Sequence, residues 1–147
     1  MAIVPFRTHR NARQFLARLE ICPAHGPQQE LCCITGGVEP GQTVEACAQQ
    51  EVYEEAGYMV DIHELTSLGQ LRPSKSADTV VHLFAVDVTG KTQHTAPSDG
   101  SSLEKSASVE WVNYDRCIHL SDPLFVTALA RLCWLISKGK GEVESIK

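Results

Sequence analysis

The sequence has fewer basic than acidic residues, and its basic residues do not cluster. Its 147 residues include 13 Lys and Arg against 18 Asp and Glu, a formal net charge of −5. Such a chain lacks the attraction on which nonspecific binding to a nucleic-acid backbone depends. We therefore expect no nucleic-acid polymer among its partners.

Long apolar segments are also absent. No apolar run approaches the ~18 residues that a membrane-spanning helix needs, and the N-terminal MAIVPFRTHR is too short in apolar residues to be a signal peptide. We expect no membrane association, a cytoplasmic location and reduced thiols. The length suits one domain, residues 1–147, with a sizeable core.

The cysteines do not form a complete metal or nucleophile motif. The segment Cys22-Pro-Ala-His25 resembles half of a zinc site, but no second Cys-x2-Cys or His-x3-His pair follows it. No Cys–His or Ser–His pairing has a motif behind it. The pattern favours free cysteines acting as small apolar residues over zinc binding or nucleophilic catalysis. The six are Cys22, Cys32, Cys33, Cys47, Cys117 and Cys133.

What the sequence does contain is a dense group of carboxylates. Glu51, Glu54 and Glu55 fall within about one turn of a helix predicted for about Val44–Ala56. At ~100° per residue, Glu51 and Glu55 lie ~40° apart, with Glu54 ~60° to the other side of Glu51. Like charges this close weaken a helix, and Mg²⁺, which prefers oxygen ligands, would offset that repulsion. The alternative is an ordinary acidic helix surface. Solvated charges are expected opposite the apolar face of a helix, whereas these glutamates overlap one edge of that face.

Turn-forming residues flank this helix on both sides. Gly36-Gly37 and Pro40-Gly41 predict a loop before it. Thr43 is the expected N-cap, and Gly57 stands where a left-handed glycine ends a helix. The unit is therefore a strand, a glycine-rich loop and a carboxylate helix that ends at a glycine.

This segment, GGVEPGQTVEACAQQEVYEEAGY, resembles the signature of the Nudix hydrolases, G-x5-E-x7-R-E-U-x-E-E-x-G-U with U apolar. The matching positions are Gly36, Glu51, Val52, Glu54, Glu55, Gly57 and, loosely, Tyr58. The resemblance implies that Glu51 and Glu55, and then Glu54, bind Mg²⁺, with Mn²⁺ as an alternative, and act in catalysis. It also implies that the carbonyl of Thr35 is a metal ligand.

Two positions depart from that signature. Gln42 stands in place of the first glutamate and Gln50 in place of the arginine. Losing one partner of an Arg–Glu pair would strand a charge, whereas two glutamines can still hydrogen-bond each other. We interpret the two changes as linked, and they leave a weakly active or non-catalytic domain as an alternative.

The remaining pattern predicts an α/β fold, and the resemblance makes it a Nudix-type α/β/α sandwich with a mixed β-sheet. The last helix should start at Pro123, capped by Ser121 or Asp122. The residues from Thr89 to Ser108 read as a long polar loop. Strands are predicted at Met1–Phe6, Gln14–Ile21, Leu31–Thr35, one or two within Val60–Leu71, Thr79–Val88 and Val109–Tyr114.

Candidate substrate ligands and a candidate catalytic base also lie outside the signature. Arginine suits bidentate phosphate binding, which makes Arg18 and Arg72 candidate substrate ligands. By resemblance, a further catalytic base or ligand comes from a loop before the last strand, and Glu104 is the first candidate, with Glu110 behind it. Core packing is the expected role of Trp111, with base stacking as the alternative.

Within the family, LRPSKSADT followed by VVHLFAVDV is most similar to ADP-ribose and nucleotide-sugar pyrophosphatases. This resemblance implies hydrolysis of a small nucleoside diphosphate joined to another group. Those enzymes often form homodimers through an N-terminal extension for which this chain lacks room, so a homodimer remains open. Hydrolysis of nucleoside triphosphates or dinucleoside polyphosphates, and nucleotide binding without turnover, are the alternatives.

Overall fold

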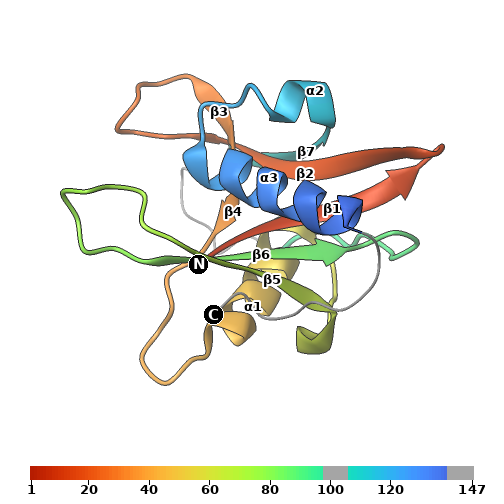
Figure 1. Ribbon diagram of the computed structural model, residues 1–147, viewed down its shortest axis with the longest axis horizontal. Coiled ribbons are helices and arrows are strands. Elements are labelled where there is room, and N and C mark those ends of the chain that lie inside the picture. The colour runs from red at the N-terminus through yellow and green to blue at the C-terminus, as the bar shows by residue number, and fades with distance from the viewer. Residues whose placement is uncertain (98–105, 139–147) are drawn as a thin grey trace.

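The computed structural model describes residues 1–97 and 106–138. Its sheet runs in the order β3-β2-β1-β6-β5, with β4 also paired to β1 and β7 to β2 (Figure 1). The strands are β1 (Ala2–His9), β2 (Ala12–Ile21), β3 (Gln29–Cys32), β4 (Ile34–Thr35), β5 (Leu65–Leu71), β6 (Val81–Asp87) and β7 (Ser108–Asn113). The helices are α1 (Val44–Ala56), η1 (Ile62–Glu64), α2 (Tyr114–Cys117) and α3 (Pro123–Ser137).

The sheet is mixed, as predicted. β1 runs parallel to β6 and antiparallel to β2 and β4. β1 and β2 form a hairpin closed by Arg10 and Asn11, whose φ angles are 49° and 63°. Two successive positive φ angles are characteristic of the tight turns that join twisted antiparallel strands. Both strands therefore extend beyond the predicted bounds to meet at this turn.

The sheet divides between β1 and β2. Their pairing starts at the hairpin turn and ends at Phe6 and Phe15. Beyond that point, β3 pairs with the second half of β2, and β4 pairs with the start of β1. The segment from Gln29 to Thr35 thus bridges the two diverging strands and continues directly into Gly36.

A break between β3 and β4 corrects the single strand predicted for Leu31–Thr35. The backbone N–H of Cys33 donates to Asp122 Oδ2 at 2.6 Å. The other oxygen of Asp122 accepts from the backbone N–H of Leu124 at 2.9 Å and caps α3. One carboxylate therefore anchors the start of α3 to the dividing point of the sheet. Sequence pattern identified the cap but not this long-range bond.

The two faces of the sheet are covered by different helices, which gives the expected α/β/α layers (Figure 1). Successive strand residues point to opposite faces. Val4, Phe15 and Ala17 pack with α3 in one cluster. Ile3 and Leu16 pack with α1 in the other. Burial of these apolar side chains on both faces stabilises the layers.

One strand lies within Val60–Leu71, as the prediction allowed, and the short helices η1 and α2 are additions to it. The region Val60–Leu71 forms one strand, β5, preceded by the short helix η1, which Asp61 and Glu64 cap reciprocally. Helix α2 was not predicted, because four residues are too few to show helical periodicity; Asn113 caps it. None of the described helices is long and apolar enough to cross a membrane.

Helix α1 has the predicted bounds and caps. Thr43 Oγ1 accepts from the N–H of Ala46 at 3.1 Å. Gly57 ends the helix with φ of 74°, and its N–H donates to the carbonyl of Tyr53 at 2.9 Å. The carbonyl of Gly57 accepts from the N–H of His94 at 2.8 Å, so this helix end is also a tertiary contact.

Replacing Gly57 by alanine should destabilise the fold strongly. Its new Cβ would lie 2.0 Å from the carbonyl oxygen of His94, in addition to the strain of a positive φ. We expect a loss of about 3 kcal/mol or more in the free energy of unfolding, measured with urea. Gly41→Ala is the matched control, because Gly41 has φ of 84° but nothing within 4 Å of its Cβ position. Equal losses in the two variants would contradict this explanation.

Candidate active site

The three carboxylates of α1 occupy two different environments. Ala48, Val52 and Ala56 are fully or almost fully buried against the sheet. Glu51 and Glu55, beside that buried stripe, are partly buried, whereas Glu54 is exposed. This agrees with the helical geometry, in which residues four apart share a face. Glu51 and Glu55 therefore form the inner part of the candidate site and Glu54 its outer part.

Gly36 packs directly against Glu51. A Cβ on Gly36 would lie 2.2 Å from Glu51 Oε1 and 2.6 Å from its Cγ. The backbone of Gly36 is itself held by Met1, whose N-terminal amine donates to the carbonyl of Gly36 at 2.6 Å. Thr35, the last residue of β4, immediately precedes this contact. The structure thus brings the peptide next to Thr35 alongside Glu51.

Arg18 joins β2 to the carboxylate helix. It is 8% exposed, and its guanidinium forms an ion pair with Glu55 Oε1. Its Nε lies 2.8 Å from Glu20 Oε2, close enough for an ion pair but without hydrogen-bond geometry. Arg18 therefore compensates two carboxylates, and its predicted role as a phosphate ligand must compete with those contacts.

The second oxygen of Glu55 has a different environment. Glu55 Oε2 is buried and has no hydrogen-bond partner among the described residues. A buried carboxylate oxygen without a partner is costly, and a cation can satisfy it. Together with the neighbouring carboxylate of Glu51, it offers the oxygen ligands that Mg²⁺ prefers. These residues fit a hard divalent cation.

The two glutamines that depart from the signature are hydrogen-bonded. Gln42 Nε2 donates to Gln50 Oε1 at 3.0 Å, as the interpretation of a linked change requires. Gln50 Nε2 in turn donates to Glu54 Oε1 at 2.9 Å. The amide chain orients Glu54 without bringing a positive charge to it. Gln50 therefore restricts where the exposed Glu54 side chain points.

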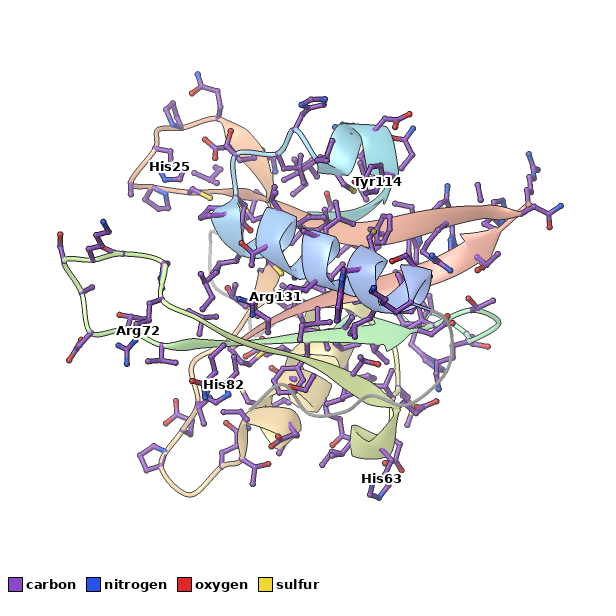
Figure 2. The ribbon with its side chains drawn as sticks, in the orientation of Figure 1. His25, His63, Arg72, His82, Tyr114 and Arg131 are labelled. Carbon is purple, nitrogen blue, oxygen red and sulfur yellow. The ribbon has the colours of Figure 1, made fainter. Side chains whose placement is uncertain are left out.

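The other predicted site residues lie elsewhere or are not described. Glu104 lies outside the described residues. Glu110 pairs with Ala17 across the strands, on the α3 face, and forms an ion pair with Arg116, which disfavours it as a base beside α1. Arg72 is exposed in the loop after β5, where its Nη1 lies 3.5 Å from the carbonyl oxygen of Asp78 (Figure 2).

An aromatic group beside the carboxylate helix was only partly anticipated. The guanidinium carbon of Arg7 lies 4.0 Å from the ring centroid of Trp111, and Tyr58 meets Trp111 edge-on at 6.3 Å. Tyr58 OH donates to Gln93 Oε1 at 3.3 Å. Burial raises the pKa of Tyr58, so its hydroxyl stays neutral. The sequence did not identify Arg7 as a site residue, because strand pairing brings it to Trp111 and no sequence motif links the two.

The comparisons with known proteins identify the family of this chain. The model of the NUDIX domain family matches residues 4–129. The chain belongs to the Nudix family. A search of curated proteins finds no significant match.

Solved structures of low sequence identity share the Nudix fold. A NUDIX hydrolase of Listeria monocytogenes, described as putative, is 23% identical, with a TM-score of 0.65 over 93% of this chain and 92% of that one. An Ap4A hydrolase of C. elegans is 16% identical, with a TM-score of 0.66 over 93% and 96%. The NUDIX domain of Shewanella oneidensis NrtR, crystallised with ADP ribose, is 10% identical, with a TM-score of 0.66 over 92% and 85%. At these identities the similarity shows the fold alone.

Gly36→Ala should displace the Glu51 carboxylate, because the added Cβ overlaps it. We expect Mn²⁺ affinity, measured by electron paramagnetic resonance, to fall about 10- to 100-fold, as for other changes that misorient a ligand. Gly37→Ala is the control, since nothing lies within 4 Å of its Cβ position. Unchanged Mn²⁺ affinity in the Gly36 variant would argue against Glu51 as a ligand.

Arg18→Met should leave the partly buried Glu55 without its ion-pair partner. We expect a loss of about 1–3 kcal/mol in the free energy of unfolding, less than for a fully buried pair. The double variant with Glu55→Gln should recover part of that loss, because the uncompensated charge is removed. Additive losses in urea denaturation of the single and double variants would show that Arg18 and Glu55 are not coupled.

Proposed function

We propose that this protein is a Mg²⁺-dependent Nudix hydrolase that cleaves the diphosphate of a nucleoside diphosphate linked to another group, of the ADP-ribose or nucleotide-sugar type. The observation that carries this proposal is the arrangement of Glu51 and Glu55 on one face of α1, with one Glu55 oxygen buried and unpartnered. Family membership supports a hydrolase.

The residues proposed to hold the metal are Glu51 and Glu55, with Glu54 and the Thr35 carbonyl completing the set. Mn²⁺ is the alternative ion. When bound, the cation neutralises charge on the diphosphate and lowers the pKa of the attacking water. The chain's own part is to orient the carboxylates: Gly36 packs against Glu51, Arg18 pairs with Glu55, and a glutamine amide holds Glu54.

Arg18 is also proposed to bind the substrate. Its guanidinium already lies at the inner carboxylates, and arginine matches phosphate oxygens bidentately. A diphosphate entering the site would share that guanidinium with Glu55. Arg72 remains a second proposed phosphate ligand on a loop, and Glu104 remains the proposed base.

A nucleotide substrate is further supported by the Arg7–Trp111 pair on the same side of the sheet as α1. A flat indole can stack a base, and the adjacent guanidinium supplies positive charge. The neighbours whose titles name Ap4A and ADP ribose keep both nucleotide classes open. Hydrolysis of dinucleoside polyphosphates or nucleoside triphosphates is the second candidate.

The Gln42–Gln50 hydrogen bond favours a third candidate, nucleotide binding with little turnover. The neutral amide chain bonded to Glu54 carries no charge to balance that carboxylate. If the lack of a positive charge beside Glu54 weakens metal binding at that carboxylate, the domain would bind nucleotides and hydrolyse them slowly or not at all.

The test is a substrate panel with Mg²⁺ and separately Mn²⁺: ADP-ribose, nucleotide sugars, dinucleoside polyphosphates and triphosphates, with product analysis. The proposal predicts two monophosphate products from the first two classes. Pyrophosphate release from triphosphates, or cleavage of the dinucleoside class, would favour the second candidate, and thermal stabilisation by a nucleotide without cleavage the third.

Glu51→Gln and Glu55→Gln should each reduce metal-dependent turnover at least about 100-fold while leaving the fold intact, since each removes a proposed ligand. The matched control is Glu45→Gln, which removes a carboxylate from the first turn of the same helix and should retain activity. Circular dichroism checks folding. Full activity in both ligand variants would refute the metal-site assignment.

A further inference from the structure

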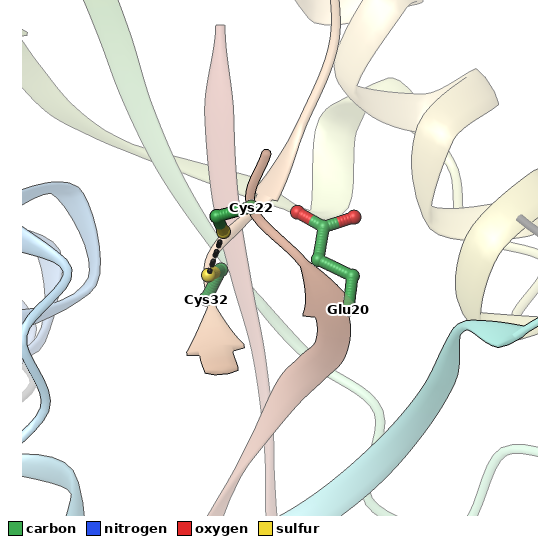
Figure 3. A group of neighbouring side chains, drawn as sticks. All are labelled: Glu20, Cys22 and Cys32. Atoms are coloured by element: carbon green, nitrogen blue, oxygen red, sulfur yellow. Dashed lines mark hydrogen bonds between the residues drawn. The ribbon is translucent and has the colours of Figure 1, made fainter. Parts of the chain in front are cut away.

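A second group of ligand-type side chains lies at the β2–β3 hairpin. Cys22 follows the end of β2, and Cys32 ends β3. Their sulfur atoms lie 3.4 Å apart, and a carboxylate oxygen of Glu20 is within 4.8 Å of both (Figure 3). Glu20 comes from β2, Cys22 from the turn after it and Cys32 from β3, so no short sequence motif contains all three.

The turn after β2 places a ring nitrogen near Cys22. The backbone N–H groups of His25 and Gly26 both donate to the carbonyl of Cys22, which folds the chain back on itself. As a result, ligand atoms of Cys22, His25 and Glu30 also lie within 4.8 Å of one another. His25 Nδ1 and Glu30 Oε2 share a hydrogen bond of 3.0 Å (Figure 2 shows His25 in this turn).

We propose that this hairpin binds one Zn²⁺ ion through the sulfur atoms of Cys22 and Cys32 and a carboxylate oxygen of Glu20, and that His25, whose ring lies near Cys22, turns toward the ion to supply the fourth ligand. Two sulfurs, one nitrogen and one oxygen form a set that zinc accepts in tetrahedral geometry. Glu30 then orients the imidazole, as carboxylates commonly do for zinc-bound histidines.

The geometry favours a metal over a disulfide between the same cysteines. Two sulfurs bound to one tetrahedral zinc at ~2.3 Å would lie roughly 3.8 Å apart, close to the observed separation. A disulfide requires about 2.05 Å.

This site is chemically distinct from the carboxylate site on α1 and goes beyond the proposed hydrolase activity. Thiolates select zinc, whereas an all-oxygen set selects Mg²⁺. The two sites nevertheless share a neighbour, because Glu20 lies 2.8 Å from Arg18, and Arg18 pairs with Glu55. A zinc ion that takes Glu20 leaves Arg18 to Glu55 and to an incoming phosphate.

The test is titration of the full, reduced protein with Co²⁺, the spectroscopic probe, followed by displacement with Zn²⁺. We expect one thiolate-bound Co²⁺ per chain, with sulfur-to-cobalt charge-transfer bands and the intense visible bands of tetrahedral cobalt; Co²⁺ held by the all-oxygen α1 site gives no sulfur charge-transfer band. Excess Mg²⁺ should not remove these bands, and Glu51→Gln should retain them, which separates this site from α1. Since thiols must lose protons, affinity should rise with pH.

Cys22→Ser and Cys32→Ser should each abolish the charge-transfer bands at the same Co²⁺ concentration. Cys133→Ser is the matched control, because it removes another partly buried thiol, on α3. Glu20→Gln, which keeps both thiols, should weaken binding, and circular dichroism confirms folding of every variant. Absence of thiolate bands in the reduced wild-type protein, their survival in Cys22→Ser, or formation of a Cys22–Cys32 disulfide without metal uptake would each overturn the proposal.

Discussion

The ion pair between Arg18 and Glu55 links the sheet to the helix that carries the carboxylates. Helix α1 places like charges next to an apolar face, where water is too scarce to screen them. Arg18, almost buried on β2, is the cation that makes this tolerable for Glu55. Because the second oxygen of Glu55 remains unpartnered, the compensation is incomplete. A further cation would therefore stabilise this carboxylate. The packing of α1 on the sheet keeps Glu55 in place in its absence.

The division of the sheet determines where that pair can form. Where β1 and β2 separate, β3 and β4 enter between them and lead the chain to Gly36, in contact with Glu51. The same separation leaves the end of β2 beside the hairpin cysteines. Asp122 holds the arrangement by capping α3 and bonding the backbone between β3 and β4. A single carboxylate thus couples the start of α3 to the break between β3 and β4.

Local signals were sufficient for much of the fold. Helix α1 was predicted with its caps because Thr43 and Gly57 bring strong local preferences. Strands β1 and β2 were identified but predicted too short at their shared hairpin, since strand ends depend on pairing partners that pattern does not reveal. The Gln42–Gln50 hydrogen bond was expected from the two linked departures and is present. Glu110 shows the opposite case: its register across β2 places it on the α3 face, and no local feature of the sequence carries that information.

By itself, the sequence determined the family, the carboxylate helix and the residue types that make a hard-metal site chemically sensible, because these depend on spacings within one segment. Only the tertiary structure decided which partners those residues meet. Arg18 pairs with Glu55 because α1 packs on the sheet beside β2. Strand pairing brings Arg7 over Trp111 and Cys32 to Cys22. The register of two paired strands is fixed when the apolar face of each strand is buried in the core. Residues that are distant in the sequence therefore become neighbours, and no single segment of the sequence shows which ones.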